Sequence, residues 1–236
     1  YVDVQKSNQQ FERVYLGSIS NNAWAMAVAD FDKNGYKDVV AGGSGFNITI
    51  FKTNNTGTGA TKTTIANSGF FLQNLTMADI NNDGWVDIFA CDDNAASHIY
   101  LNDGAGNFTT QSNIINFNLP NGSDNSGNYG SVWTDFDNDG DLDLYIAKCR
   151  QSVQNPNDPR RINVMFVNNG NGTFTENAAA YNINIGWQTW TASFGDIDND
   201  GDLDLMITNH DHDSQIFQND GTGVYTDITA ATGFYV

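Results

Sequence analysis

Four short segments place acidic and amide side chains at the same alternating positions. They begin at Asp30, Asp79, Asp135 and Asp196, and each follows the pattern Asp-x-Asp/Asn-x-Asp/Asn-Gly-x-x-Asp. Alternate residues of a tight loop point their side chains into one concavity, and a hard divalent cation prefers roughly six to eight oxygen ligands at short range. The spacing therefore predicts that each loop surrounds one cation. Calcium suits such a set of oxygens, so we expect about four structural Ca²⁺ ions.

Each position of the loop has an expected role. Positions one, three and five supply side-chain oxygens, glycine at position six permits the sharp turn, position seven supplies its backbone carbonyl, and the aspartate at position nine closes the site. The predicted ligands are Asp30, Asp32, Asn34, Tyr36 and Asp38; Asp79, Asn81, Asp83, Trp85 and Asp87; Asp135, Asp137, Asp139, Asp141 and Asp143; and Asp196, Asp198, Asp200, Asp202 and Asp204. Only the last two loops have carboxylates at every side-chain position, so we expect them to bind more tightly.

Neither simple turn formation nor an EF-hand accounts as well for these loops. Asp, Asn and Gly favour turns without any metal, but four copies in register that retain an acid at positions one and nine favour metal binding. An EF-hand would need Glu at position twelve and a following helix. The twelfth residues are Ala41, Ala90, Ile146 and Ile207, and a β-like run follows each loop.

The composition restricts the classes of partner and the possible states of the cysteines. The 236 residues carry a formal charge of −18, which argues against nucleic acid or an anionic membrane surface as the partner. No apolar run approaches the roughly 20 residues that a membrane helix needs. The two cysteines, Cys91 and Cys149, either form one bridge or are two buried thiols, and neither has a zinc-site spacing.

The loops belong to a longer repeat. An apolar run and an Asn/Gly turn follow each loop, as in the segments 99–108 and 165–174, so each repeat predicts four short strands. Four-stranded sheets that recur at about 50 residues are typical of a β-propeller. We therefore expect an all-β protein of four-stranded antiparallel blades in a single domain, residues 1–236. The approximate blades are 17–65, 66–115, 116–180 and 181–236.

The strand before each loop should be the innermost strand of its blade. Three residues before the first aspartate stand compact residues, namely Ala27, Thr76, Val132 and Ser193, as expected where blades crowd an axis. Six residues before it stand Trp24, Gln73, Tyr129 and Trp190. We interpret these aromatics as blade-to-blade packing, with a ligand platform as the alternative.

The loop and blade pattern resembles FG-GAP/VCBS repeats, the calcium-loop blades of integrin α-type propellers and of many secreted bacterial proteins. The resemblance covers nearly the whole chain, although no literal Phe-Gly…Gly-Ala-Pro string is present. Such propellers usually have more than four blades, and the segment 11–16 is similar to the last strand of a preceding blade. The resemblance therefore implies a secreted or cell-surface protein of bacterial type, which is part of a larger propeller or closes as a small one.

Partner binding is expected on the face opposite the calcium loops, where the irregular segments 92–97, 118–128, 148–161 and 209–213 lie. One candidate set is basic and could meet an anionic glycan or a carboxylate: Lys148, Arg150, Arg160 and Arg161. A solubilising cluster is the alternative. His210 and His212 could hold a transition metal, although a solvated loop is favoured because no third ligand is near.

Two classes of function remain open. The favoured one is a non-catalytic, calcium-stabilised extracellular binding or adhesion module that recognises a protein or a polysaccharide, with no nucleic acid and no membrane insertion. The alternative is a carbohydrate-active enzyme of the polysaccharide lyase type, which the resemblance allows. The sequence contains no nucleophile elbow, triad string or zinc signature. Most closely spaced carboxylates belong to the calcium loops, so we predict no catalytic residue.

Overall fold

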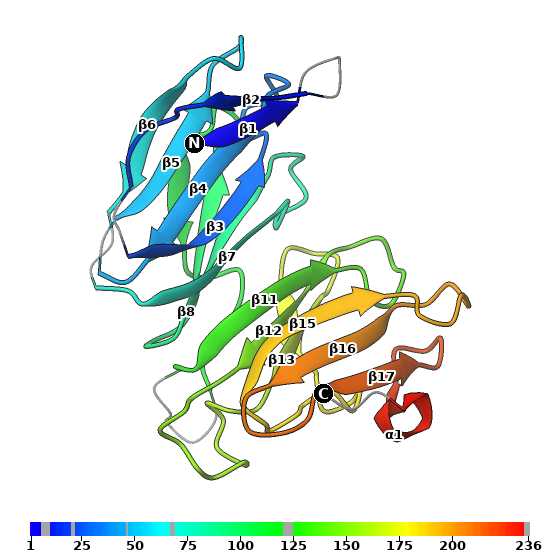
Figure 1. Ribbon diagram of the computed structural model, residues 1–236. Helices are drawn as coiled ribbons and strands as arrows, with labels where there is room; N and C mark the ends of the chain where they lie inside the picture. Colours follow the sequence, from blue (N-terminus) through cyan, green and yellow to red (C-terminus); the bar gives the residue numbers. More distant parts are fainter. Residues whose placement is uncertain (6–9, 20–21, 46, 67–68, 120–124, 234–236) are drawn as a thin grey trace.

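The computed structural model describes residues 1–5, 10–19, 22–45, 47–66, 69–119 and 125–233. Part of the irregular segment 118–128, at 120–124, therefore lies outside the described residues. Within the described part, the chain forms four four-stranded antiparallel sheets, one two-stranded sheet and one short helix. The predicted all-β class with four-stranded blades is confirmed (Figure 1).

The strands follow one another in chain order within every sheet. Each calcium-type loop joins the first strand of its sheet to the second, and each Asn/Gly turn joins the third to the fourth. The first sheet contains β3 (Ala23–Ala29), β4 (Asp38–Gly43), β5 (Ile48–Thr53) and β6 (Ala60–Ile65), and the second contains β7 (Leu72–Ala78), β8 (Asp87–Asp92), β9 (His98–Asn102) and β10 (Phe108–Gln111). The third contains β11 (Asn128–Thr134), β12 (Asp143–Lys148), β13 (Val164–Asn168) and β14 (Phe174–Glu176), and the fourth contains β15 (Thr189–Gly195), β16 (Asp204–Asn209), β17 (Gln215–Asn219) and β18 (Tyr225–Asp227). The helix α1 (Thr229–Thr232) follows β18.

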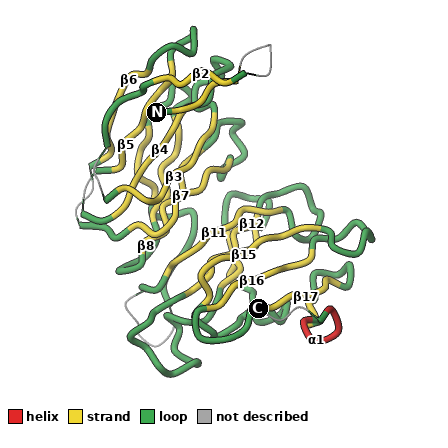
Figure 2. The backbone as a smooth tube through the Cα atoms, in the orientation of Figure 1, coloured by secondary structure: helices red, strands yellow, loops and turns green. Residues whose placement is uncertain are grey.

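The sheets are arranged as successive propeller blades. β3 packs beside β7, β7 beside β11, and β11 beside β15, so the first strands form the inner edge of the arrangement (Figures 1 and 2). Gly130 of β11 allows a close approach, because an added Cβ would lie 2.7 Å from the backbone oxygen of Trp190 in β15. Whether these blades belong to a larger propeller or close as a small one stays a prediction with two alternatives.

The core lies between consecutive blades, because successive residues of a strand face opposite sides of the sheet. In β8, Ile88 and Ala90 are buried against the first blade, whereas Phe89 and Cys91 are buried against the third. This explains why the second strand of each blade is an apolar run rather than an alternating one.

The N-terminal strands β1 (Val2–Gln5) and β2 (Phe11–Val14) form a hairpin that covers the outer face of the first blade. Val14 and Leu16 are buried there against Phe51 of β5. The structure therefore places the segment 11–16 where a preceding blade would pack, and it pairs this segment with β1.

Every first strand contains a β-bulge at the same position. The register shifts between residues 23 and 25, 72 and 74, 128 and 130, and 189 and 191. The bulged residues are Trp24, Gln73, Tyr129 and Trp190, the four that stand six positions before each loop. Bulges redirect side chains and are common beside functional sites, so these residues form a distinct set at the end of the blades opposite the loops.

Two further expectations concern the cysteines and the membrane. Cys91 and Cys149 are both buried and free, so the possible bridge between them does not form. In the part of the chain that the structure describes, no helix is long and apolar enough to cross a membrane.

Candidate metal centres and the opposite face

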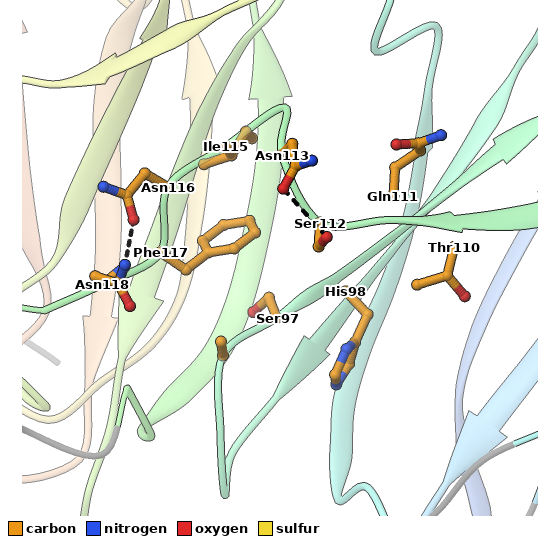
Figure 3. Close-up of a pocket in the computed structure, with 11 residues that line it drawn as sticks. Ser97, His98, Thr110, Gln111, Ser112, Asn113, Ile115, Asn116, Phe117 and Asn118 are labelled. Atoms are coloured by element: carbon orange, nitrogen blue, oxygen red, sulfur yellow. Dashed lines mark hydrogen bonds between the residues drawn. The ribbon is translucent and has the colours of Figure 1, made fainter.

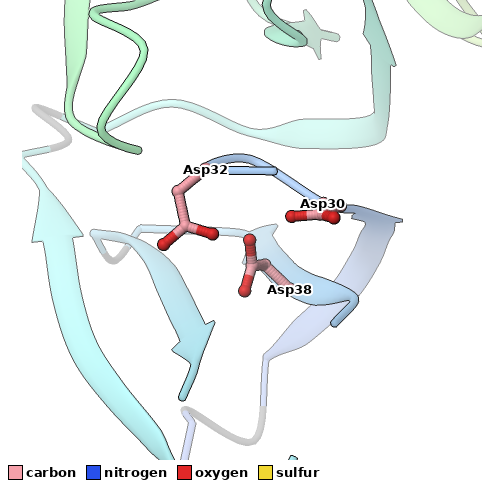
Figure 4. A group of neighbouring side chains, drawn as sticks. All are labelled: Asp30, Asp32 and Asp38. Atoms are coloured by element: carbon pink, nitrogen blue, oxygen red, sulfur yellow. The ribbon is translucent and has the colours of Figure 1, made fainter. Parts of the chain in front are cut away.

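The first loop brings its carboxylates together as predicted. Asp30, Asp32 and Asp38 point toward one another in Figure 4, and each offers an oxygen within 4.8 Å of the others. The third and fourth loops form the same arrangement with their corresponding residues, which are Asp135, Asp137 and Asp143, and Asp196, Asp198 and Asp204. The second loop has the amide of Asn81 at its third position instead of a carboxylate.

Backbone groups of the loop hold the first carboxylate in place. In the first loop, Asp30 accepts hydrogen bonds from the N–H groups of Asn34 at 3.0 Å and Gly35 at 2.9 Å. The second loop repeats both bonds on Asp79, and the fourth repeats them on Asp196. The residue at position seven donates its N–H to position five, as Tyr36 does to Asn34 at 2.8 Å. The loop is therefore closed by its own local bonds.

The carboxylate at position nine ties the loop to the third strand of the blade. Asp38 is fully buried and accepts N–H groups from Phe31 at 2.8 Å and from Thr53 at 2.7 Å. Asp87 does the same with Ile80 and Asn102. Burial raises the pKa of Asp87 to about 6. A buried carboxylate in this position calls for a counter-charge, and a bound cation would provide it.

The third loop has oxygen atoms that the protein leaves unsatisfied. Asp135 Oδ1 and Asp143 Oδ2 are buried and have no hydrogen-bond partner among the described residues. Burial also raises the pKa of Asp143 to about 7. Buried polar atoms nearly always have a partner, so two unsatisfied carboxylate oxygens in one loop fit a cation ligand set.

These residues fit calcium by their chemistry as well as by their arrangement. All the side-chain donors are carboxylate or amide oxygens, which are the ligands of a hard cation. The backbone carbonyls of Tyr36, Trp85, Asp141 and Asp202 stay predicted ligands. The side chains at position seven have another role, because three of them contact the preceding loop.

The opposite face does not present the predicted basic cluster as one patch. Lys148 is 1% exposed, and its Nζ donates to Ser126 O at 2.8 Å and to Asn128 Oδ1 at 2.9 Å. Arg161 is 3% exposed and pairs with Asp211 at 2.6 Å. Both positively charged side chains are therefore buried and hydrogen-bonded inside the fold, where they hold the insertion 148–161 in place.

The other two arginines lie apart. Arg160 pairs with Asp158, two residues earlier, at 2.9 Å. Arg150 reaches from the third blade to Asp93 in the second blade, with Nη1 to Oδ1 at 3.3 Å. Arg150 lines a cavity on this face.

The two histidines stack on different tryptophans. His212 lies parallel to Trp187, with the ring centres 4.0 Å apart, and His210 lies parallel to Trp190 at 5.1 Å. Neither histidine belongs to a group of three possible metal ligands among the described residues. The transition-metal alternative therefore lacks a ligand set, and His210 is instead part of an aromatic surface.

Sequence reasoning missed three residues of this face. Asp93, Gln73 and Gln188 form its hydrogen bonds: Gln73 donates to Asp93 at 3.2 Å, while Gln188 accepts the N–H of Arg150 at 2.6 Å and donates to its carbonyl at 3.0 Å. One signal pointed to Gln73, since it is the non-aromatic member of the set six positions before the loops. No local pattern marks Asp93 or Gln188, each of which bonds to Arg150 from another blade.

A second cavity lies at the side of the second blade. Its volume is about 530 Å³, and it is enclosed by β10 and the segment 112–118, with Ser97, His98 and Phe117 in its lining (Figure 3). His98 Nε2 lies 3.2 Å from Asp92 Oδ2, and its ring stacks on Phe70. Within the described structure, Ser97 forms no hydrogen bond with His98. The Asp92–His98 pair is therefore not extended by this serine into a nucleophilic triad.

Comparison with known proteins identifies the repeat. A family model described as FG-GAP-like repeat matches three segments, residues 30–90, 79–146 and 152–207. No curated protein matches the chain.

Solved structures show similar folds at low identity. The biofilm matrix protein Bap1 of V. cholerae is 18% identical with a TM-score of 0.43, over 85% of this chain and 27% of that one. A putative exo-beta-1,3-galactanase from Bifidobacterium bifidum s17 is 14% identical with a TM-score of 0.45. The match covers 93% of this chain and 74% of that one. BBS1N, solved in complex with ARL6DN, is 8% identical with a TM-score of 0.50. The match covers 93% of this chain and 60% of that one. The chain thus spans about a quarter of the first of these proteins, and the likeness concerns the fold alone.

Proposed function

Because the chain belongs to the family of FG-GAP-like repeat proteins, we propose that it is a calcium-stabilised extracellular binding module. In this proposal, four Ca²⁺ ions sit in the loops that begin at Asp30, Asp79, Asp135 and Asp196, and a protein or polysaccharide binds the opposite face. The two unsatisfied carboxylate oxygens of Asp135 and Asp143 are the observation that carries it. The role of the module is binding rather than catalysis.

Calcium would supply positive charge where the fold concentrates negative charge. The loops hold 16 of the 28 acidic residues, and like charges this close repel one another. Neutralising them favours the folded state, because the assembled ligand set exists only there. Extracellular modules of this kind typically bind calcium at about 10⁻⁴–10⁻³ M, a range that suits a site outside the cell.

The differences between the two faces support separate roles for them, metal binding at the loops and partner binding on the opposite face. Each loop is tied to the third strand of its own blade by a buried aspartate, as Asp38 is to Thr53. The opposite ends of the blades carry the longer irregular segments and the exposed side chains of Trp24 and Trp190. Variable loops on a rigid scaffold are where binding residues concentrate.

The test is the melting temperature of the whole chain with calcium and with excess chelator. We expect calcium to raise it in a concentration-dependent way, as a ligand of the folded state must. Asp137→Asn should reduce the calcium-dependent shift, whereas Asp213→Asn, which removes one charge from an exposed residue outside the loops, should not. A melting temperature that chelator leaves unchanged would contradict the proposal.

A further inference from the structure

The bulged residues form a row at the end of the inner strands opposite the calcium loops. Trp24 and Trp190 are 47% and 43% exposed, which is unusual for tryptophan in a domain with large buried cores. In the part of the chain that the structure describes, both rings are accessible, which allows the alternative role, a platform for a ligand.

The rings of this row are held in fixed orientations. Trp190 lies nearly parallel to Tyr129, with ring centres 6.3 Å apart, and nearly parallel to His210, at 5.1 Å. Trp24 packs at an angle against Phe71, and its Nε1 donates to Leu72 O at 2.8 Å. A preorganised aromatic surface loses little conformational freedom when a ligand binds.

Gln73 interrupts the row and opens a notch. A cavity of about 400 Å³ lies there, and its lining includes Phe71, Gln73, Asp93, Tyr129 and Arg150. The second blade, which supplies Gln73, thus has a short amide where the other three blades have a large ring. The result is a polar hollow that is bordered by aromatic side chains.

Backbone and side-chain hydrogen bonds hold Asp93, the central polar group of the notch, in place. The backbone of Asp93 donates its N–H to Phe71 O at 2.9 Å and accepts one from Gly127 at 2.9 Å. Its side chain accepts from Gln73 and from Arg150. Gly127 has φ +82°, and an added Cβ would lie 2.2 Å from Arg160 O, so this junction needs glycine.

The notch retains capacity to bind a ligand. The side chains of Arg150 and Asp93 are partly exposed, at 26% and 17%, so a ligand in the notch can reach them. Asp93 and Arg150 together are close to neutral, and they offer acceptors and donors a few ångströms apart. A small set of converging polar groups beside apolar rings is the usual composition of a small-molecule site.

A pyranose sugar has the chemistry that matches this surface. Its C–H face is apolar and can lie on an aromatic ring, while hydroxyl groups at its edge both donate and accept hydrogen bonds. An anionic sugar fits less well, because Arg150 is already paired with Asp93 and the chain carries a charge of −18. A protein partner would need a more continuous apolar surface than isolated tryptophans around a polar hollow.

We propose that the notch between the second and third blades binds a neutral hexopyranose unit of a polysaccharide. Tyr129 in its lining and the adjoining Trp190 form the stacking surface, and Asp93, Arg150 and Gln73 are the hydrogen-bonding groups. This inference rests on the proposed function as a binding module, for which it names the partner and the site.

The test is titration of the calcium-loaded chain with neutral hexasaccharides of glucose, galactose and mannose in different linkages. Tryptophan fluorescence and NMR saturation transfer measure the binding. A hexasaccharide of uronic acids and an unrelated acidic peptide are added as separate arms. We expect at least one neutral oligosaccharide to bind with Kd of about 1 mM or tighter. Trp190→Ala and Asp93→Asn should each weaken its binding about tenfold or more.

The matched control is Trp187→Ala. Trp187 stacks on His212 as Trp190 does on His210. Trp190 also lies beside Tyr129, which lines the notch, whereas within the described residues no ring contact joins Trp187 to the lining. This variant should bind within about twofold of the wild type, a difference of about 0.4 kcal/mol. Asp93→Asn keeps the shape of the side chain, so it provides a test even if Trp190→Ala fails to fold. The calcium-dependent melting temperature verifies folding of each variant.

Three results would overturn the inference. They are the absence of binding to every neutral oligosaccharide, binding of only the uronic acid oligomer or the peptide, and binding that Trp190→Ala and Asp93→Asn leave unchanged. If calcium still raises the melting temperature in these cases, the calcium-stabilised module stands and only the choice of partner and site fails. If calcium has no effect, the proposed function fails separately.

Discussion

The ammonium group of Lys33 lies 4.3 Å from the ring centre of Trp85, which joins the first metal loop to the second. Lys33 is the fourth residue of its loop, and Trp85 is the seventh residue of the next. The same pair of positions meets again where Asn82 donates to Asp141 at 2.8 Å and where Asn138 donates to Asp202 at 3.3 Å. Position four has positive φ in all four loops, which turns its side chain out of the metal concavity. Neighbouring loops are thus linked side chain to side chain.

The contact between Lys33 and Trp85 should stabilise the chain measurably. A cation over an exposed aromatic ring contributes about 0.5–1 kcal/mol. We expect a double-mutant cycle of Lys33→Asn and Trp85→Phe, measured by urea unfolding in saturating calcium, to give a favourable coupling free energy of this size. Asn tolerates the φ of 53° at position 33. Additive effects of the two substitutions would show that the loops do not interact here.

The link between Asn82 and Asp141 predicts a salt-dependent effect. Asn82→Asp would place a carboxylate against Asp141, while Asn199→Asp changes the same loop position in the fourth loop, where no side-chain partner is found within the described residues. We expect the first variant to lose about 0.5–1 kcal/mol more unfolding free energy than the second. The difference should shrink from 50 mM to 1 M salt, since the Debye length falls to about 3 Å. Equal losses at low salt would contradict this prediction.

The loops should differ in calcium affinity. Position five is Asp83 in the second loop and Asp139 in the third, and Asp139 belongs to the loop with more carboxylates and two unsatisfied oxygens. We expect Asp139→Asn to remove a tight site and Asp83→Asn to remove a weaker one in calorimetric titrations with calcium. The reverse order would show that repulsion among the carboxylates outweighs their attraction to the ion.

Arg161 should matter for stability and Arg160 should not. Arg161 is buried and donates to Val153 O at 3.0 Å and Gly186 O at 3.1 Å besides its pair with Asp211. We expect Arg161→Met to cost about 2–3 kcal/mol of unfolding free energy, below the range for fully buried pairs because Asp211 is partly exposed. The matched variant Arg160→Met breaks a local, partly exposed pair and should cost about 0.5 kcal/mol or less. Urea unfolding in saturating calcium compares the two.

The two cysteines should be unreactive thiols in the folded protein. Burial raises the pKa of Cys91 to about 12 and that of Cys149 to about 11. At pH 8, a thiol-specific disulfide reagent should therefore label neither in the native state and both after denaturation. Both pKa values lie above that of an unfolded thiol, so these groups stabilise the fold below about pH 8, and this contribution is lost as the pH rises toward 11. A mass two hydrogens lower under non-reducing conditions would instead reveal a bridge.

The sequence by itself determined the aspartate-rich loops and the blades. Each loop closes through bonds between residues at most seven positions apart, such as Asp38 with Phe31 and Asp30 with Gly35. The residue types therefore set its shape before any tertiary contact forms. The same holds for the Asn/Gly hairpins, and repetition of both units along the chain sufficed to predict four-stranded antiparallel sheets.

The tertiary structure alone decided which side chains of different blades meet. Arg150 and Asp93 are 57 residues apart, and Arg161 and Asp211 are 50 residues apart. Their contacts depend on the packing between blades and on the bulges of the first strands, neither of which follows from a local pattern. For this reason the sequence grouped four basic residues that the fold separates, and it left Asp93 and Gln188 unmarked. Local rules placed the carboxylates of the loops, whereas the notch on the opposite face exists only where the second and third blades come together.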